Sequence, residues 1–461
     1  MNSILDKTLF DGFAATNQET LEGLYKALQA GSGVDAGAFT GGRALIPESL
    51  DQTLVNILFT QDEARLFQRL KKTPVRSPVH QWDQRTAVGS DDGAWVPEAG
   101  DAIEADQTIA RKYVTMKYLQ TLRKVSLQAS ISNMIEDAIA LEKNAGTLWL
   151  IRNVERSLFG GDATSFPQMP DGLDALIPAT NVINLQGADA TSTAFEDAVI
   201  DACRNIRDNY GKGSLLLAST LVTADIQKLL RDRMRVPAGE NAFGSAIFKN
   251  YVTPFGSPEV LDDIFVKEGA APSASALTSQ APGALSGPSL THPSDASSKV
   301  TAALAGTYFY KIVPVNRYGE GAAVASSPTS VTVAVGEIAR FAVTDTSPAE
   351  TAYRIYRSKK GAADATDVRY VKTIARTGAS QNIDDTFDDF AGTSSVYILT
   401  MDTVYDAIEW VQFLPMMKFD LYPTTSAVYP FLMLLFGALA LKKPVQHVRI
   451  KGISPSGLGW Y

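Results

Sequence analysis

Residue types that could do chemistry are few in this chain, and they lie far apart. Its 461 residues include three histidines, His80, His292 and His447, which fall in segments that we predict to be a ribbon, a linker and a terminal strand. No serine in a Gly-x-Ser-x-Gly setting marks a nucleophile beside any of them. The sequence therefore argues against hydrolase chemistry, and we assign no catalytic residue.

Two local clusters could hold a ligand, and a simpler interpretation is favoured for each. Four aspartates, Asp384, Asp385, Asp388 and Asp389, lie close together, but their spacing differs from that of an EF-hand calcium loop. We expect a solvated turn there. Residues 211–214 (GKGS) resemble a phosphate-binding loop, yet they lack its full glycine spacing and precede a predicted strand. We expect a helix end followed by a turn, with no metal and no cofactor.

Charge and cysteine content limit the classes of function. The net charge of -8 argues against a protein whose main task is to grip phosphate through a basic face. The single cysteine, Cys203, excludes an internal disulfide framework and fits a reducing cytoplasm. No secretory signal is visible at the N-terminus. The most apolar run, 429–441, is too short to span a bilayer, so we expect a buried strand and no membrane partner.

Basic residues cluster on both sides of the predicted ribbon, where they could meet acidic neighbours or nucleic-acid phosphates. No aromatic platform is interleaved with them, so any phosphate contact would be diffuse. A solvated face is the commonest explanation of such charge. The two clusters are Arg65, Arg69, Lys71, Lys72 and Arg76, and Arg111, Lys112, Lys117, Arg123 and Lys124.

The longest helical pattern runs from Asn133 to Phe159 and is expected to form a spine for the fold. Asn133 and Glu136 resemble a capping box, and the glycines that begin at Gly160 are expected to end the helix in the left-handed conformation. A rod of this length, roughly 40 Å, is longer than a small core needs. Its apolar stripe is predicted at Ile135, Ala138, Leu141, Ala145, Leu148, Ile151, Val154 and Leu158.

Before this spine, residues 1–62 are predicted to be an arm and residues 73–125 a long hairpin. The alternation of apolar and polar residues around Met116 has the period of a strand. An isolated two-stranded ribbon is marginally stable in water, so this hairpin should lie on another surface. Trp82 and Trp95 are the expected anchors.

After the spine, helix and strand patterns alternate, and the pattern then becomes all-β. A helix over 194–209, a buried strand over 214–219 and a short helix over 223–231 form a predicted α/β unit. Ala, Ser, Pro, Gly and Thr dominate residues 269–298, which we predict to be a linker without regular elements. Short alternating strands follow, as in a small sandwich, at 308–315, 330–335, 353–357 and 368–374.

The last part of the chain returns to strands with mixed patterning. They are predicted at 397–399, 410–416, 431–441 and 445–450. Because they follow the sandwich, we expect them to pair with strands that precede Gly269. The sandwich is then an insertion into another domain.

Three short stretches accompany this order of arm, hairpin, spine helix, α/β unit and return strands. They are residues 158–162 (LFGGD), 171–173 (DGL) and 449–453 (RIKGI). Together with the order of parts, they resemble a tailed-bacteriophage major capsid protein of the Hong Kong 97 fold, which is an α+β fold. The resemblance implies an N-terminal arm at 1–62, an E-loop at 73–125 and a P-domain at 126–189 with its spine helix at 133–159. It also implies an A-domain at 190–268, an insertion at 269–395, and return strands at 396–461 that complete both the A-domain and the P-domain.

The insertion has a resemblance of its own. Residues 306–316 (GTYFYKIVPVN), 319–321 (GEG) and 353–358 (YRIYRS) are similar to fibronectin type III or immunoglobulin-like modules. The stretches occur in the reverse of the usual fibronectin order. An inserted module of this kind is expected on the outer face of a shell.

The capsid resemblance implies self-assembly. Copies would form hexamers and pentamers of an icosahedral shell that encloses double-stranded DNA, with portal, scaffold and decoration proteins as further partners, and the shell would be assembled in the host cytoplasm and found in the virion. No motif indicates the covalent cross-link that some members form. The expected inter-subunit contacts are Trp82, Trp95, Arg111, Lys112, Lys117, Arg123 and Lys124.

Three alternatives stay open from the sequence. An encapsulin-like shell would hold enzyme cargo in place of DNA. A surface adhesin could be built around the sandwich, although no signal segment supports it. A cytoplasmic enzyme that carries a β-module is the third.

Overall fold

The computed structural model describes residues 61–456 except 90–94, 99, 102–103, 105, 132–136, 232–248, 267–268, 274, 284, 345–349 and 424–425. The chain divides into two units, Met1–Ile57 with Ser132–Asp137, and Leu58–Ile131 with Ala138–Tyr461. All elements below belong to the second unit. The predicted arm lies almost wholly outside the described residues, which begin with a 3-10 turn, η2 (Gln61–Glu63), and the helix α2 (Arg65–Arg69).

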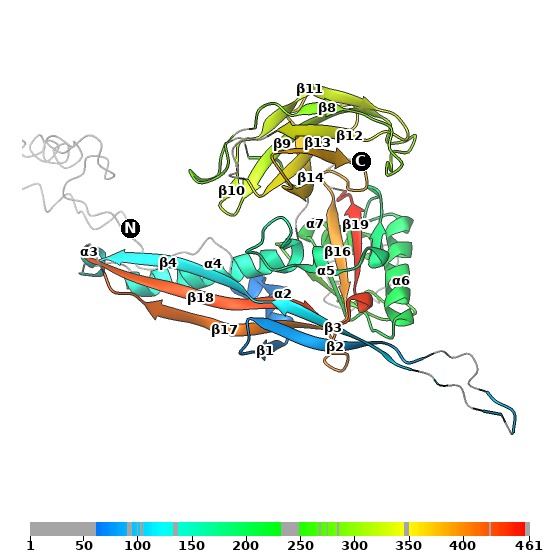
Figure 1. Ribbon diagram of the computed structural model, residues 1–461, viewed down its shortest axis with the longest axis horizontal. Helices are drawn as coiled ribbons and strands as arrows, with labels where there is room; N and C mark the ends of the chain where they lie inside the picture. The colour runs from blue at the N-terminus through cyan, green and yellow to red at the C-terminus, as the bar shows by residue number, and fades with distance from the viewer. Residues whose placement is uncertain are drawn as a thin grey trace, which may run out of the picture. The chain divides into compact units, whose positions relative to one another are not determined.

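A long helix and a four-stranded sheet form the first layer pair. The helix is α4 (Ala138–Gly160), and the short helix α3 (Leu127–Ile131) precedes it. The sheet has the order β1-β17-β18-β4 (Figure 1). Its strands are β1 (Lys72–Pro74), β17 (Ile408–Asp420), β18 (Val428–Leu441) and β4 (Lys117–Ser126). The face of the sheet that carries Val125, Phe431 and Met433 packs against Leu150 of α4.

The described part of α4 buries most of the predicted stripe, with one shift of face. Leu148 is half-buried and Ala145 is exposed, whereas Leu150 is fully buried. Gly146 explains the difference, because a Cβ at this position would lie 2.3 Å from the Sδ atom of Met433. The helix therefore approaches β18 through Gly146. The predicted capping box lies outside the described residues.

The end of α4 differs from the prediction of a left-handed glycine, which is wrong. Neither Gly160 nor Gly161 has a positive φ, and the Gly161 amide donates to the Ser157 carbonyl at 3.0 Å in ordinary helical fashion. A Cβ on Gly161 would lie 2.2 Å from the Pro170 carbonyl oxygen. The Gly172 amide donates to the Gly161 carbonyl at 2.9 Å. Close contact between two backbone segments, not a left-handed turn, is what requires glycine here.

The hairpin is shorter than the predicted 73–125. Only β2 (Val79–Ala87) and β3 (Thr108–Thr115) pair with each other. The chain changes sheets at the buried Met116, whose amide donates to the Pro78 carbonyl at 2.8 Å. Beyond this residue, β4 takes β18 as its partner over its whole length. The sequence period predicted the strand, but it carries no information on which strand would be its neighbour.

The predicted α/β unit and its return strands form a five-stranded sheet in the order β5-β19-β16-β6-β7. Its pairings confirm that strands near the end of the chain join strands that precede Gly269. The helices are α6 (Thr193–Asp208), which the Ser192 side chain caps, and α7 (Thr220–Arg231). The remaining elements of this region are α5 (Leu173–Leu176), η3 (Ala179–Asn181), β5 (Val182–Asn184), β6 (Leu215–Ala218), β7 (Glu259–Asp262), β16 (Ser394–Leu399), η4 (Pro444–Gln446) and β19 (Val448–Ile453).

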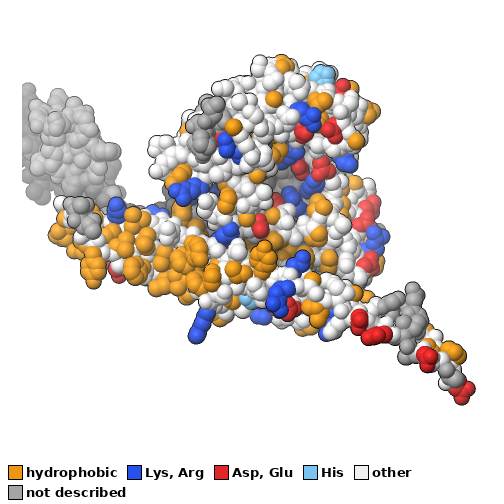
Figure 2. Space-filling view, in the orientation of Figure 1, with side chains coloured by type: hydrophobic (Ala, Val, Ile, Leu, Met, Phe, Trp, Pro, Cys, Tyr) orange, Lys and Arg blue, Asp and Glu red, His pale blue; other side chains and the backbone are white. Residues whose placement is uncertain are grey.

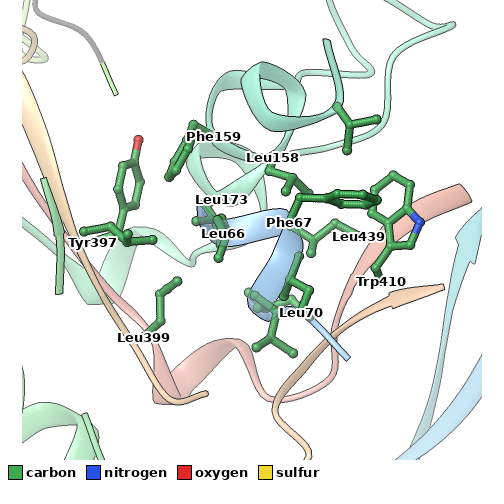
Figure 3. Packing of buried hydrophobic residues seen from close by; sticks show 14 of the residues in the cluster. Leu66, Phe67, Leu70, Leu158, Phe159, Leu173, Tyr397, Leu399, Trp410 and Leu439 are labelled. Carbon is green, nitrogen blue, oxygen red and sulfur yellow. The ribbon is translucent and has the colours of Figure 1, made fainter. Parts of the chain in front are cut away.

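One hydrophobic core joins the two sheets, and α2 lies within it (Figure 3). Phe67 of α2 meets Trp410 of β17 edge to face, with ring centroids 5.5 Å apart. Leu66 and Leu70 share this core with Tyr397 and the end of α4. A helix of five residues is too short to be stable alone, so burial of its two apolar side chains, and of Leu70 directly after it, is what holds it.

The inserted region is all-β, with strands in the order β14-β13-β9-β11-β8-β12-β15, and β10 pairs with β9. The strands are β8 (Ser289–Thr291), β9 (Gly306–Asn316), β10 (Gly319–Glu320), β11 (Val324–Val333), β12 (Ala339–Thr344), β13 (Ala352–Ser358), β14 (Val368–Ala375) and β15 (Ser380–Asp385). The linker prediction is wrong at β8, which is an integral strand. A single residue pair, Ser327 with Ser289, joins β11 to β8, and rings from both halves, such as Tyr310 and Phe341, share one core.

Candidate functional site

The outer face of the four-stranded sheet is apolar, and much of it is left uncovered by the described chain. At one end, the base of the hairpin covers Ala438 and Ala440 of β18. Tyr118 and Leu122 of β4 stand on this face, opposite Phe436 and Leu432 of β18. Met417 and Phe419 of β17 continue it beyond Leu434 and Leu432. Phe419 is 53% exposed and Leu122 is 49% exposed. Figure 2 shows hydrophobic side chains gathered along these strands. A contiguous apolar patch of this kind marks an interaction surface.

The apolar run that forms most of β18 was a sequence signal for this face, but it was interpreted only as a buried strand. The run from 429 to 441 was expected to be a buried strand because it is apolar without alternation. Residues Phe431, Met433 and Leu435 are indeed buried against the protein's own core, but Leu432, Leu434 and Phe436 between them are only half-buried. A strand that is apolar on both faces needs cover on both. At Leu432, Leu434 and Phe436, the described chain supplies full cover on only one face.

The two tryptophans expected as anchors have different environments. Trp82 packs at the base of the hairpin with Met116 and Val411 of its own chain. The Gln84 side chain also donates to the Lys442 carbonyl, so the base of the hairpin is held by the body. Trp95, near the tip, is 98% exposed. Only Trp95 is free to anchor the hairpin on another molecule.

Two of the five basic candidates form ion pairs within the chain. Arg111 donates to Asp83 across the hairpin at 2.8 Å, and Arg123 of β4 lies 3.4 Å from Glu142 of α4. These ion pairs neutralise Arg111 and Arg123, which were expected to contact a neighbouring subunit.

The other three basic candidates keep charge available. Lys117 donates to the Pro167 backbone carbonyl at 2.5 Å, a contact that leaves its charge unneutralised. Lys112 and Lys124 are exposed. The structure brings Lys112, Lys117 and Trp82 to one cavity and leaves the remaining candidates apart.

The first basic cluster meets carboxylates rather than a free surface. Arg69 binds Glu259 of β7 through two hydrogen bonds of 2.6 and 3.1 Å, and Arg65 pairs with Asp262. Lys71 lies 3.0 Å from Asp406. The sequence left acidic neighbours or nucleic-acid phosphates as possible partners of this cluster. For these three residues, the partners are acidic side chains of the same chain.

A pair of buried carboxylates lies beside α2. The two carboxylate oxygens of Glu155 on α4 accept the Leu66 and Phe67 amides at 2.8 and 3.0 Å. Burial raises the pKa of Glu155 well above its usual value, and the neighbouring Asp263 raises it further. Burial also raises the pKa of Asp263. Two buried carboxylates in contact hold one proton between them, because both cannot be charged cheaply.

We expect Asp263→Asn to stabilise the unassembled chain at neutral and alkaline pH. A carboxyl whose pKa is raised on folding contributes stability below its usual pKa, and that contribution is lost as pH rises through the raised value. The asparagine amide can donate a hydrogen bond to Glu155 without taking up a proton from solution. The loss of folding stability as pH rises should therefore be smaller by about 1 kcal/mol for each unit of pKa shift. Urea unfolding across a pH series measures this effect. Asp106→Asn, on the exposed hairpin, is the control, and parallel pH profiles for both variants would contradict the assignment.

The chemical candidates from the sequence do not converge. His80 lies 3.8 Å from Glu409, and His292 lies 3.2 Å from Glu337 in another part of the fold. His447 is buried, and burial lowers its pKa to about 4. Within the described ranges, no group of three or more His, Cys, Asp or Glu side chains could hold a metal ion. Residues 211–214 connect α6 to β6, as the simpler interpretation predicted.

The aspartate cluster is not the solvated turn that was expected. Asp385 is buried and binds Arg357 at 2.5 Å, while Asp384 binds Arg340. Asp388 and Asp389 both bind Lys451 of β19, at 2.5 and 2.9 Å. Each carboxylate therefore has a cation of the protein as its partner, and the last two tie the insertion to the five-stranded sheet.

A family model identifies the chain. The model of the SU10 major capsid protein matches residues 22–277, more than half of the chain. The chain belongs to this family. It is therefore a major capsid protein, a component of the virion, and the capsid assignment from the order of parts is confirmed. The expected mixture of helices and sheets, with an N-terminal hairpin, a spine helix and an α/β unit completed by return strands, is confirmed as well.

Relatives are similar over nearly the full length. The major capsid protein of Staphylococcus phage S25-3 is 23% identical, and the match covers 97% of this chain and 98% of the relative. The putative major capsid protein of Enterococcus phage phiEF24C is 24% identical over 94% of this chain and 95% of its own. A chain of the holo-SrpI encapsulin complex from Synechococcus elongatus PCC 7942 is 10% identical, with a TM-score of 0.46, and covers 91% of this chain and 96% of its own.

Membrane-spanning helices are not found in the described part of this capsid protein, where no helix is long and apolar enough to cross a bilayer.

Proposed function

We propose that copies of this chain form hexamers and pentamers, and that these build an icosahedral shell around the double-stranded DNA of a tailed phage. The observation that carries the proposal is the uncovered apolar face formed by Tyr118, Leu122, Met417, Phe419 and the half-buried residues between them. Membership in a family of major capsid proteins supports it. Portal, scaffold and decoration proteins are the further partners that such a shell would use.

Burial of this face supplies the driving force for assembly. Apolar surface removed from water contributes roughly 25 cal/mol per Å². Aromatic side chains are also enriched among the residues that contribute most to interfaces. The hairpin of a neighbouring copy is a suitable cover, because β3 exposes Ile109 and Tyr113 along its length. Contacts between copies then bury the exposed sides of both the sheet and the hairpin.

We also propose that the insertion is an immunoglobulin-like sandwich whose strands occur in an altered chain order. Two layers are supported by the single residue pair that joins β11 to β8 in the path β14-β13-β9-β11-β8-β12-β15, and by the core that both halves share. The A-B-E and G-F-C strands of such modules are layered in this way. Here the hairpin of β9 and β11 precedes β12 to β15 in the chain. This order accounts for a reversed appearance of the two fibronectin-like stretches in the sequence. An outward position of the module on the shell fits its role as an insertion.

Electron microscopy of the purified protein tests the proposed function. We expect closed shells or capsomer rings in negative stain, and nuclease-protected double-stranded DNA in shells from infected cells. Small separate particles at every concentration and salt tested would contradict assembly. Shells that contain cargo protein and no DNA would support the encapsulin alternative instead.

A charged side chain on the apolar face should block assembly without unfolding the chain. For Leu122→Glu and Phe419→Glu we expect no shells, because each would bury an unpaired carboxylate between copies. Thermal unfolding of the unassembled protein should change little, since both side chains are about half exposed. Val335→Glu, at an exposed position of the insertion, is the matched control. Normal shells from both face variants would show that this face is not an interface.

A further inference from the structure

A cavity of about 390 Å³ lies between the base of the hairpin and the body of the same chain. We call it the socket and define it by Trp82, Lys112, Lys117, Leu176, Leu439 and Asp171. Trp82 and Lys112 are cross-strand neighbours on the hairpin, while Leu176 belongs to α5 and Leu439 to β18. Its size is sufficient for one large side chain.

The chemistry of the socket favours an aromatic group that is accompanied by negative charge. Leu176 and Leu439 give it apolar walls. The Nε1 atom of Trp82 is buried, and no acceptor for it is present among the described residues. Lys112 has no carboxylate partner in the described chain, and Lys117 contacts only a backbone carbonyl. The single carboxylate, Asp171, accepts the Ala163 amide at 2.8 Å.

The tip of the hairpin carries the complementary groups. Residues 86–110 contain six carboxylates and no lysine or arginine. Glu98 and Asp101 are exposed near Trp95, which is itself 98% exposed. Figure 2 shows acidic side chains along this end of the hairpin. A tryptophan is the side chain with the most apolar area to gain from burial, and its indole N–H usually finds a partner when buried.

We propose that Trp95 of one copy inserts into the socket of a neighbouring copy, with the carboxylates of the tip beside Lys112 and Lys117. The inference rests on the proposed function, because it specifies one contact within the shell. Trp95 is 98% exposed in the single chain, so it does not occupy its own socket. The occupant is therefore a second copy.

Cross-linking tests this contact and leaves Trp95 in place. The native Cys203 is buried, so the double variant Val96→Cys with Ala163→Cys has one reactive thiol beside Trp95 and one at the wall of the socket. A short bis-maleimide should join different copies in assembled particles, giving a ladder of oligomers in denaturing gels. The matched control, Val96→Cys with Thr332→Cys on the insertion, should give none.

Assembly measurements complete the test. Trp95→Ala should raise the protein concentration needed for assembly by at least about tenfold, as expected for a buried aromatic anchor, and Trp95→Phe should restore most of the loss. Lys112→Glu should act in the same direction as Trp95→Ala. If wild-type particles form but the Val96/Ala163 pair does not cross-link between copies, the socket contact is wrong and the proposed function stands. If the wild-type protein forms no particles, the proposed function itself fails.

Discussion

Gly161→Ala is expected to prevent the chain from reaching its folded state. An added Cβ would lie 2.2 Å from the Pro170 carbonyl oxygen and 2.5 Å from the Ser157 carbonyl oxygen. Both obstacles are backbone atoms, which cannot rotate away as a side chain could. Gly172 lies where the same two backbone segments cross, and a Cβ there would be 2.5 Å from the Ser157 carbonyl oxygen. Separation of these segments would open the core at the end of α4, at a cost of about 3 kcal/mol or more.

The neighbouring Gly160 provides the control for this prediction. A Cβ there meets nothing within 4 Å, and Gly160 has no positive φ. Gly160→Ala should therefore be neutral, or stabilising by up to about 1 kcal/mol, because alanine is the better helix former. Soluble yield and thermal unfolding of the two variants measure the difference. Equal stability of the two alanine variants would show that the crossing can relax and that Gly161 is not required.

Arg357→Ala is expected to unfold the insertion while the four-stranded and five-stranded sheets persist. Arg357 and Asp385 are almost completely buried, 2.5 Å apart. Arg357 also lies 4.2 Å from the centroid of the Phe387 ring and donates to the Asp389 carbonyl at 2.9 Å. Removal of the cation leaves Asp385 charged and unpaired in the core, which costs about 3–5 kcal/mol. The Tyr310 hydroxyl, 3.1 Å away, is neutral and cannot replace it.

Peptide-resolved hydrogen exchange in increasing urea measures this loss. Peptides from β9, β13 and β15 should lose protection first in the Arg357→Ala variant, while those from β16 and β19 keep theirs. Arg317→Ala, at an exposed position on the same module, is the control. Simultaneous loss of all sheets would contradict the independence of the insertion.

Periodicity in the sequence predicted elements well and partners poorly. The helical pattern of 194–209 and the strands around Tyr353 and Val368 are present as predicted. The alternation through Met116 was also a true strand signal, yet the strands on its two sides belong to different sheets. Strand neighbours are set by contacts between distant residues, and these leave no local pattern. For the same reason β8 appeared to be part of a linker.

The candidate interface was predictable in kind, but only partly in its residues. Residue type alone indicated Trp95, whose exposure supports its selection, and it equally indicated Trp82, which packs at the base of its own hairpin. Arg111 and Arg123 were chosen for charge, but cross-strand and helix partners neutralise them. The apolar outer face was missed because a run of apolar residues does not show which alternate positions the protein itself covers. Pairing registers were needed to separate Leu432 from Met433.

The central claim is that this capsid protein is incomplete as a single copy. Its hairpin becomes ordered, and its apolar sheet face becomes buried, on neighbouring copies. Hydrogen exchange compared between the dilute unassembled chain and the assembled shell tests it most directly. We expect amides of β3 and of the hairpin beyond Gln84 to exchange quickly in the single chain and far more slowly in the shell. Equal, strong protection of these amides in the dilute single chain would contradict the account.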